Sequence, residues 1–452
     1  MPNILLTTRC NLSCKYCFAQ EKLSSNRTNM TMENVRRVID FLQRSNFPIF
    51  RVMGGEPTLH PQFNEIIRLA IAANMRVDVL SNATWSESTA NLFERIPSKY
   101  LMFLLNIDHP DNYTSKQWGL IQRNLNRLKG RGGITLSFNV FEKQPRGNYV
   151  LDLATCYDFK YIRLSLSLPV MNAGNVYLPI EQLSEIAPFV LQFLRDAESK
   201  GISVQFDNAV PLCIFDEAQV GKLLLHGVYD LNRNLRCNPI IDIGPDLTIW
   251  SCFCLSPLKN RRLDEFQTLA EAQAYYSKVW SAYQDTIYPM EKCYTCLYRE
   301  KWGCQGGCLS YAIMKDHGER FETHLADPPR NILLPSTTFA LAEDIRTLYY
   351  DIPTTTCVLR KTSTNLEFEV DPAFQYVLPL LDGQHTLADI IAAFPATSSG
   401  SEQMQVFLKE TIDEAIQDLL NALFVRGFLR TNTPVLITRT EPDYAAPSKR
   451  FC

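Results

Sequence analysis

Ten of the 14 cysteines in this 452-residue chain fall into three groups whose spacing suits the thiolate ligands of a metal centre. The first group has the pattern C-x3-C-x2-C, and the third has the pattern C-x2-C-x7-C-x3-C. Thiolates at such short spacings can converge on one soft metal centre. The grouped residues are Cys10, Cys14 and Cys17; Cys237, Cys252 and Cys254; and Cys293, Cys296, Cys304 and Cys308.

The ligand number separates zinc from iron–sulfur chemistry in the first group. A structural zinc site closes its shell with four ligands, but this group offers three cysteines and no nearby histidine. Three thiolates on a four-iron cluster leave one iron open to a substrate or cofactor, which favours a catalytic [4Fe–4S] cluster. In the third group, four cysteines within 16 residues could instead form a zinc knuckle. The isolated cysteines are expected to be ordinary thiols, most of them buried; they are Cys156, Cys213, Cys357 and Cys452.

The composition excludes several classes of protein. A chain of this length that is 46% hydrophobic and 21% charged can bury large cores and is expected to form two or three domains. A net charge of -3 argues against a nucleic-acid partner. No apolar run is long enough for a membrane span, and the start lacks a signal-peptide pattern. We therefore expect a cytoplasmic protein whose cysteines are thiols or metal ligands rather than disulfides.

The residues up to about 208 alternate between short apolar segments and amphipathic segments. The apolar segments are predicted strands at 3–8, 48–53, 76–81, 100–107, 134–141 and 161–168. The amphipathic segments are predicted helices near 31–45, 62–73, 85–95, 115–130 and 180–200. This alternation predicts an α/β fold with a parallel sheet, either open and doubly wound or a barrel.

Polar and glycine-rich positions follow these strands one after another. Cys10 follows the first strand, residues 54–57 the second, Ser81-Asn82 the third and Asp108 the fourth. Ligands of parallel sheets bind at the carboxyl ends of the strands, so we expect these residues to gather in one site.

Three features together resemble the radical S-adenosylmethionine (SAM) enzymes. They are the C-x3-C-x2-C pattern after the first strand, the aromatic Tyr16 before the third cysteine, and Gly-Gly-Glu-Pro after the second strand. The resemblance covers roughly residues 1–210 and implies a partial (β/α)6 TIM barrel. It implies that Cys10, Cys14 and Cys17 hold a [4Fe–4S] cluster that binds SAM and yields a 5′-deoxyadenosyl radical, which abstracts hydrogen from an unactivated carbon.

The same resemblance assigns further residues to SAM. The segment Gly54, Gly55, Glu56 and Pro57 is expected to contact the SAM amino group, because glycines let backbone carbonyls approach a ligand closely. Polar side chains on later strands are expected, by position, to bind the ribose and carboxylate; they are Ser81, Asn139 and Arg163.

The second cysteine region, about 237–325, resembles a SPASM domain, the auxiliary-cluster extension of peptide-modifying radical SAM enzymes. Carried over, Cys237, Cys252 and Cys308 hold one auxiliary [4Fe–4S] cluster, with Cys254 as an adjacent candidate. The second cluster takes Cys293, Cys296 and Cys304. The x7 spacing departs from the commoner x5, and the usual last cysteine is absent. Its fourth ligand could be Asp327, His324 or Cys357, or the site is incomplete.

The region from about 355 to 432 has two strand-like segments and three helix-like segments, a winged-helix-like α+β plan. Its apolar stripe is expected to form a core through Val377, Leu380, Leu381, Ile390, Ile391, Ile412, Ile416, Leu419 and Leu420. With 5 Lys and Arg against 10 Asp and Glu, the region is a poor match for DNA. It resembles the recognition element of enzymes that modify ribosomally made peptides (RiPPs), which adds a leader peptide to a sheet edge; here that edge would lie within 357–370. A structural or dimerising winged helix is the alternative.

These resemblances predict a RiPP maturase with five segments. They are the barrel at 1–210, the SPASM domain at 211–330, a linker at 331–354, the recognition element at 355–432 and a tail at 433–452. The expected partners are a precursor peptide and a reductant such as flavodoxin or ferredoxin, and the expected product is an oxidative crosslink (thioether, carbon–carbon or ether). Epimerisation, with a hydrogen donor such as Cys213, is an alternative. Others are action on a folded protein, as in sulfatase maturation, or on a small molecule, and a zinc-bearing winged-helix regulator or scaffold.

Overall fold

A computed structural model gives the structure of the chain, which forms two compact units. It describes residues 2–20, 27–237, 240–284, 287–317, 330–332, 335–350, 356–362, 366–370, 372–393 and parts of 413–438. The first unit comprises Met1–Trp280 and Gly307–His324, and the second comprises Ser281–Gly306 and Leu325–Cys452.

The first unit is built on one ten-stranded sheet with the order β10-β9-β8-β1-β2-β3-β4-β5-β6-β7. The strands are β1 Asn3–Thr7, β2 Ile49–Gly54, β3 Arg76–Ser81, β4 Leu101–Asn106, β5 Ile134–Val140, β6 Tyr161–Leu166, β7 Ser203–Phe206, β8 Ile241–Ile243, β9 Thr248–Ser251 and β10 Arg261–Arg262. Strands β1–β7 are parallel neighbours, and β8 is parallel to β1 on its other side. The expected α/β partial barrel is confirmed, with β7 and β8 added to the six predicted strands.

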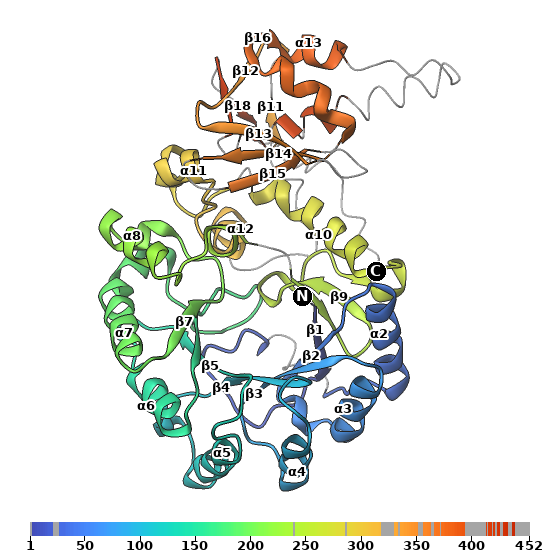
Figure 1. The fold of residues 1–452 in the computed structure, drawn as a ribbon, viewed down its shortest axis with the longest axis vertical. Helices are drawn as coiled ribbons and strands as arrows, with labels where there is room; N and C mark the ends of the chain where they lie inside the picture. The colour runs from blue at the N-terminus through green and yellow to red at the C-terminus, as the bar shows by residue number, and fades with distance from the viewer. Residues whose placement is uncertain are drawn as a thin grey trace, which may run out of the picture. The chain divides into compact units, whose positions relative to one another are not determined.

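Helices connect these strands and cover the outside of the curved sheet (Figure 1). They are α2 Met32–Arg44, α3 Phe63–Ala72, α4 Glu87–Arg95, α5 Ser115–Arg127, α6 Asn148–Tyr157 and α7 Ala187–Ser199. Helices α8 Glu217–Leu225 and α9 Leu231–Asn234 precede β8, and α10 Leu269–Gln284 and α12 Leu309–His317 follow β10. The sequence pattern did not predict α6. Short 3-10 turns lie at η1 Pro57–Leu59, η2 Pro110–Asn112, η3 Ile180–Ile186, η4 Leu212–Ile214, η5 Phe253–Leu255 and η6 Leu263–Glu265. No helix in the described part of the chain is both long and apolar enough to cross a membrane.

The helix ends follow their sequence signals. Thr31 caps α2 by accepting from the backbone of Asn34, and Val35, Val38, Ile39 and Leu42 form the buried face of that helix. Thr114 and Gln117 form a reciprocal capping box at the start of α5. These helices pack on the sheet through side chains that alternate regularly with exposed ones, which is why the pattern predicted them.

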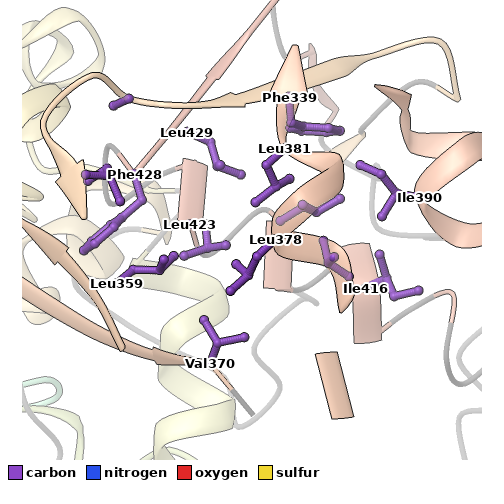
Figure 2. Close-up of a cluster of buried hydrophobic side chains, with 14 of the residues drawn as sticks. Phe339, Leu359, Val370, Leu378, Leu381, Ile390, Ile416, Leu423, Phe428 and Leu429 are labelled. Carbon is purple, nitrogen blue, oxygen red and sulfur yellow. The ribbon is translucent and has the colours of Figure 1, made fainter. Parts of the chain in front are cut away.

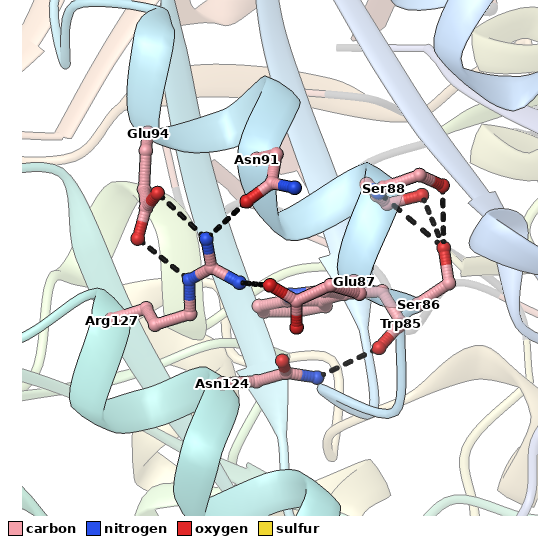
Figure 3. A network of polar contacts seen from close by, with 9 residues as sticks. Trp85, Ser86, Glu87, Ser88, Asn91, Glu94, Asn124 and Arg127 are labelled. Atoms are coloured by element: carbon pink, nitrogen blue, oxygen red, sulfur yellow. Dashed lines mark hydrogen bonds and ion pairs between the residues drawn. The ribbon is translucent and has the colours of Figure 1, made fainter.

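Helices α4 and α5 are joined by a polar network on their outer surface (Figure 3). The Arg127 guanidinium binds Glu87 and Glu94 at 2.6 Å each, and it also contacts Asn91. One turn earlier on α5, the buried Asn124 amide donates to the backbone carbonyls of Ala83 and Trp85 at 2.8 and 3.0 Å. Asn124 thereby fixes the loop that follows β3, at the carboxyl edge of the sheet.

The second unit contains two three-stranded sheets and a two-stranded pair, β11 with β18. Its elements are η7 Glu291–Thr295, α11 Leu297–Trp302, β11 Arg330–Ile332, β12 Thr338–Leu341, β13 Ile345–Tyr350, β14 Thr356–Lys361, β15 Leu366–Val370, η8 Pro372–Leu380, β16 Asp382–Thr386, α13 Leu387–Ala392, β17 Leu429–Thr431 and β18 Leu436–Thr438. One sheet has the order β13-β14-β15 and the other β16-β12-β17. The expected linker at 331–354 is therefore corrected, because β12 and β13 lie within it and pair into both sheets.

The apolar stripe predicted for this region does form a core (Figure 2). Val377, Leu381, Ile390, Ile416 and Leu420 are buried in it, and Leu380, Ile391 and Leu419 pack against it. Ile412, most of the helix expected at 402–425 and Cys452 lie outside the described residues. The start of the tail expected at 433–452 is corrected, because β18 lies within it and pairs with β11.

The pairing of β8 with β1 creates a buried carboxyl group. Asn3 Nδ2 donates to Asp242 Oδ1 at 2.7 Å, and burial raises the pKa of Asp242 to about 7. The buried Asn3 Oδ1 has no hydrogen-bond partner. A protonated Asp242 could donate to it, whereas an ionised Asp242 cannot.

Replacing Asp242 with Asn should stabilise the protein, and more so at alkaline pH. The folded state holds the Asp242 proton more tightly than the unfolded state, so native stability falls as pH rises from about 4 to about 7 and stays reduced above that. The full penalty is roughly 4 kcal/mol. D242N removes it and can donate to Asn3 Oδ1. Thermal unfolding at pH 5 and pH 8 should show a larger gain at pH 8, and D152N, at an exposed aspartate, should show no such trend.

Candidate active site at the carboxyl edge of the sheet

The loop after β1 carries the first three cysteines. Its turn is closed by the Cys17 N–H donating to the Cys14 carbonyl at 3.2 Å. Burial is the main cause that raises the pKa of Cys10 to about 11 and of Cys14 to about 12. The pKa of Cys14 is also raised by the charges of Cys10 and Cys17, so the three sulfurs lie within electrostatic reach of one another. One short loop therefore gathers three thiols, as its spacing predicted.

Two glycines at the end of β2, Gly54 and Gly55, lie directly against this loop. A Cβ added to Gly54 would come within 2.7 Å of the Thr7 carbonyl oxygen, and one added to Gly55 within 2.3 Å of the Arg9 carbonyl oxygen and 2.8 Å of Cys10 Cβ. The Gly55 N–H donates to Thr7 and the Glu56 N–H to Arg9, at 2.9 and 2.8 Å. We expected glycines here for approach to a ligand; the structure gives the close approach of the cysteine loop as a reason of its own.

The Glu56 carboxylate, fully buried, is bound entirely by protein donors. Oε1 accepts from the Thr58 and Ser81 hydroxyls at 2.6 and 2.8 Å and from the Thr58 N–H at 3.2 Å, and Oε2 accepts from the Asn82 N–H at 2.8 Å. Burial nonetheless raises the pKa of Glu56. Pro57 begins the η1 turn that presents Thr58. Glu56 thus joins the loop after β2 to the end of β3, and Ser81 is turned toward it.

Two asparagines extend this connection to the cysteine loop. Asn82 Nδ2 donates to Asn11 Oδ1 at 3.0 Å, and Asn11 Nδ2 donates to Thr84 Oγ1 at 2.9 Å. Asn11 lies between Cys10 and Cys14, so the loop is tied through Asn82 to the residue beside Ser81. The pairing was not predicted, because residues 71 positions apart carry no local signal for it.

A pocket opens at the carboxyl ends of β4 and β5, and its Asp108 lies within electrostatic reach of Cys14. Asp108 and Asn139 line it with polar groups, and Phe141, Arg146 and Tyr149 form other parts of its wall. The Tyr16 ring packs on Phe141 with centroids 5.0 Å apart, and the charge of Asp108 raises the pKa of Cys14. A carboxylate and an amide at this position can hydrogen-bond the hydroxyl groups of a bound ligand.

Arg163 does not line this pocket. Its guanidinium binds Asp207 Oδ2 at 3.2 Å and Ser137 Oγ at 2.9 Å, so it ties β6 to its two neighbouring strands. Of the three polar residues expected from later strands, the structure places Asn139 at the pocket, Ser81 against Glu56 and Arg163 in this inter-strand network.

Four cysteines from three chain segments meet elsewhere in the first unit. Cys308 contacts both Cys237 and Cys254 through hydrogen bonds between the thiol groups, and Cys254 also contacts Cys252. The two thiols and the Ser310 hydroxyl, 3.1 Å away, lower the pKa of Cys308 by hydrogen bonding. The interleaving carried over from the SPASM resemblance had placed Cys237, Cys252 and Cys308 together, and Cys254 joins them.

The remaining three cysteines of the third group lie in the second unit. The Gly306 N–H donates to Cys304 Sγ at 3.4 Å, and a Cβ on Gly306 would come 3.4 Å from Cys293 Sγ. Cys296 begins helix α11. Cys357, a candidate fourth ligand, instead lies fully buried in the apolar core on β14, so that suggestion is corrected. His324 and Asp327 lie outside the described residues.

Comparisons with known proteins agree with this geometry. Residues 4–136 match the family model for the radical SAM superfamily. The Fe-coproporphyrin III synthase of Methanosarcina barkeri is 33% identical over 79 residues, 18% of this chain and 20% of that protein. The sporulation killing factor maturation protein SkfB of Bacillus subtilis is 25% identical over 222 residues, 46% of this chain and 47% of that protein. The matches thus span less than half the length of either relative.

A solved structure shares the fold more widely. Streptococcus suis SuiB, in its complex with the precursor peptide SuiA, superposes with a TM-score of 0.50 at 14% identity, covering 71% of this chain and 74% of that one. Residues 4–136 thus match a radical SAM domain, and the enzymes of that superfamily use SAM and a [4Fe–4S] cluster.

The residues present fit these cofactors. Three thiols on one loop could bind three irons of such a cluster, and the pocket lined by Asp108 and Asn139 offers polar groups that could bind SAM. Among the described residues, no three His, Cys, Asp or Glu side chains converge as ligands of a single metal ion. A four-iron cluster bonds each thiolate to a different iron, so its ligands need not converge in that way.

Gly55→Ala should prevent assembly of the first cluster, because the added methyl overlaps the Arg9 backbone and displaces the loop that carries Cys10. Iron and sulfide analysis after anaerobic reconstitution should show a loss of about four irons per chain. Gly174→Ala is the matched control, since nothing lies within 4 Å of its added Cβ. Full iron content in G55A would contradict this account of the glycine pair.

Proposed function

We propose that this protein is a radical SAM maturase of a ribosomally made peptide, which binds a precursor peptide and installs an oxidative crosslink. The cysteine loop, the glycine pair and the adjoining pocket supply a radical SAM site. The observation that carries the proposal further is the meeting of Cys237, Cys252, Cys254 and Cys308 in the same unit. The peptide-maturation relative and the fold shared with a peptide-bound maturase support the substrate class.

Cys10, Cys14 and Cys17 would hold the radical SAM cluster, and Asp108 and Asn139 would hydrogen-bond the hydroxyl groups of SAM in the pocket. When bound, these cofactors would supply a 5′-deoxyadenosyl radical that could remove hydrogen from the peptide. The protein's part is to hold the loop in place: Glu56, Asn82 and Asn11 fix it from one side, and the backbone of Gly55 and Glu56 from beneath.

The four thiols of the second set would hold an auxiliary [4Fe–4S] cluster. One thiolate for each iron leaves no position open, so this cluster would accept an electron rather than ligate the peptide. A crosslink removes two hydrogens, and the second electron needs such an acceptor. Cys293, Cys296 and Cys304 would serve a further cluster in the second unit, and flavodoxin or ferredoxin is the expected class of external reductant.

The second unit offers an edge on which a leader peptide could add as a strand. Strand β14 is paired on both sides, so within the expected segment 357–370 the available edge is that of β15. Among the described residues, β15 pairs with β14 alone. An extended peptide can complete the backbone hydrogen bonds of such an edge. Phe368 anchors β15 by packing against the apolar core, and Glu367 binds Arg360 of β14.

Replacing Cys10, Cys14 and Cys17 together with Ala should abolish reductive cleavage of SAM to 5′-deoxyadenosine and lower the iron content by about four per chain. The iron held by the other cysteines should remain. Cys156→Ala, at an exposed cysteine outside the three groups, is the matched control. If the triple variant still cleaves SAM, the first cluster is wrongly assigned.

Leader binding can be tested by hydrogen exchange on the full chain. Addition of the leader of a candidate precursor peptide should slow exchange at alternate amides of 366–370, because only every second N–H of an edge strand points outward. The amides of β14 should exchange as before. A scrambled leader is the control, and protection confined to other strands would exclude β15 as the docking edge.

The product distinguishes crosslinking from the alternatives. Mass spectrometry of a co-expressed candidate peptide should show the loss of two hydrogen atoms for each crosslink, whereas epimerisation leaves the mass unchanged. A peptide that is neither bound nor altered, with SAM cleavage intact, would point to a folded protein or a small molecule as substrate.

A further inference from the structure

Phe253 occupies a position that none of the cysteine patterns explains. It lies between Cys252 and Cys254, and its side chain is 5% exposed. It belongs to a small apolar cluster with Leu5, Ala19, Met53 and Trp250, against which Cys17 and Leu80 are packed. Phe253, which lies between two thiols of the second set, therefore packs in the same apolar cluster as Cys17 of the first set.

Aromatic contacts connect the two sets directly. The rings of Phe18 and Phe253 meet edge to face with centroids 5.1 Å apart, and Trp250 meets Phe253 at 5.5 Å. Phe18 follows Cys17 in the chain and remains 39% exposed. Phe18 is therefore the solvent-facing ring of the pair and Phe253 the buried one, in the edge-to-face arrangement that aromatic pairs favour.

The backbone around Phe253 holds the ring in place. Cys252 has φ 53° and ψ 155°, a backbone conformation that non-glycine residues rarely adopt. Its N–H donates to the Ile240 carbonyl at 2.9 Å, and the Cys254 carbonyl accepts from Met171 at 3.2 Å. This sharp turn ends β9 and directs Phe253 into the apolar cluster while its neighbours join the second thiol set.

We propose that Phe253 is a positioning residue that excludes water from Cys17 and thereby lowers the reduction potential of the cluster on Cys10, Cys14 and Cys17. Phe18 completes the same barrier from outside. The inference rests on the radical SAM cluster alone and holds whether or not the second set binds iron. If the inference holds, the segment that carries Cys252 and Cys254 helps to set the reduction potential of the cluster held by the first cysteine set.

The direction of the effect follows from charge hydration. One-electron reduction adds a negative charge to the cluster, and an apolar surrounding penalises that charge more than water does. Solvent exposure and the hydrophobic shell are among the factors that set iron–sulfur potentials. Opening a path for water to Cys17 should therefore favour the reduced state and raise the midpoint potential.

The test is a redox titration of the reconstituted full chain, followed by electron paramagnetic resonance of the first cluster. The Cys10/Cys14/Cys17→Ala variant identifies its signal by subtraction. Phe253→Ala and Phe18→Ala should each raise the midpoint potential with iron content retained. Phe253→Leu, which keeps apolar bulk, should return it toward the wild-type value. Phe266→Ala is the control, because it removes a different aromatic contact, between the half-buried rings of Phe266 and Tyr275 with centroids 5.7 Å apart.

The outcomes are distinguishable. An unmoved potential in Phe253→Ala and Phe18→Ala, with iron retained, overturns the inference and leaves the proposed function standing. If Phe253→Ala does not fold, Phe18→Ala decides alone, because its half-exposed side chain can be removed without a buried cavity. If the triple cysteine variant shows every signal that the wild type shows, the assignment of the first cluster is overturned instead. An equal shift in Phe266→Ala would overturn the specific role of Phe253.

Discussion

The site depends on how closely the loops after β1 and β2 approach each other. Gly54 and Gly55 let the backbone of the cysteine loop lie where any side chain would overlap it, and two backbone hydrogen bonds then join the loops. Glu56 extends this connection to the end of β3, because its buried carboxylate accepts four hydrogen bonds from Thr58, Ser81 and Asn82. Burying a carboxylate is costly unless its oxygens are bonded, and here both are. Three consecutive strand ends are thus locked into one surface.

Much of this surface could be predicted because its signals are local. The six strands from 3 to 168 and most of their helices follow from periodic apolar patterns, and the three cysteine groups follow from spacing. The roles of single polar residues could not be predicted in the same way. Ser81 and Arg163 lie on the strands that the sequence predicted for them. Their partners, Glu56 and Asp207, depend on the tertiary packing of the sheet, which the sequence pattern does not reveal. Helix α6 was missed because it begins after Gly147 with no side-chain cap and no acidic residue in its first turn.

The second cysteine region shows both the strength and the limit of pattern transfer. The interleaved pattern predicted Cys308 beside Cys237 and Cys252, although these residues are far apart in the chain. The structure brings them together with Cys254. The same transfer offered Cys357 as a ligand, and that residue is a core side chain on β14. An isolated cysteine carries no spacing to distinguish the two roles, so only its neighbours can. The strands at 338–341 and 345–350 were likewise hidden, because prolines and short polar runs around them resemble a linker.

Strand β8 has a consequence for how the molecule is made. It pairs with β1, from which it is separated by about 240 residues, whereas β2, the other neighbour of β1, follows after about 45. During synthesis, β1 can therefore gain one neighbour early, and its second edge must wait until more than half of the chain has emerged. Chains fold from the amino terminus as they appear, and distant pairings form late. The amino-terminal thiol loop can thus settle on the glycine pair before the segment carrying Cys252 and Cys254 has been synthesised, so the two cysteine sets assemble at different times.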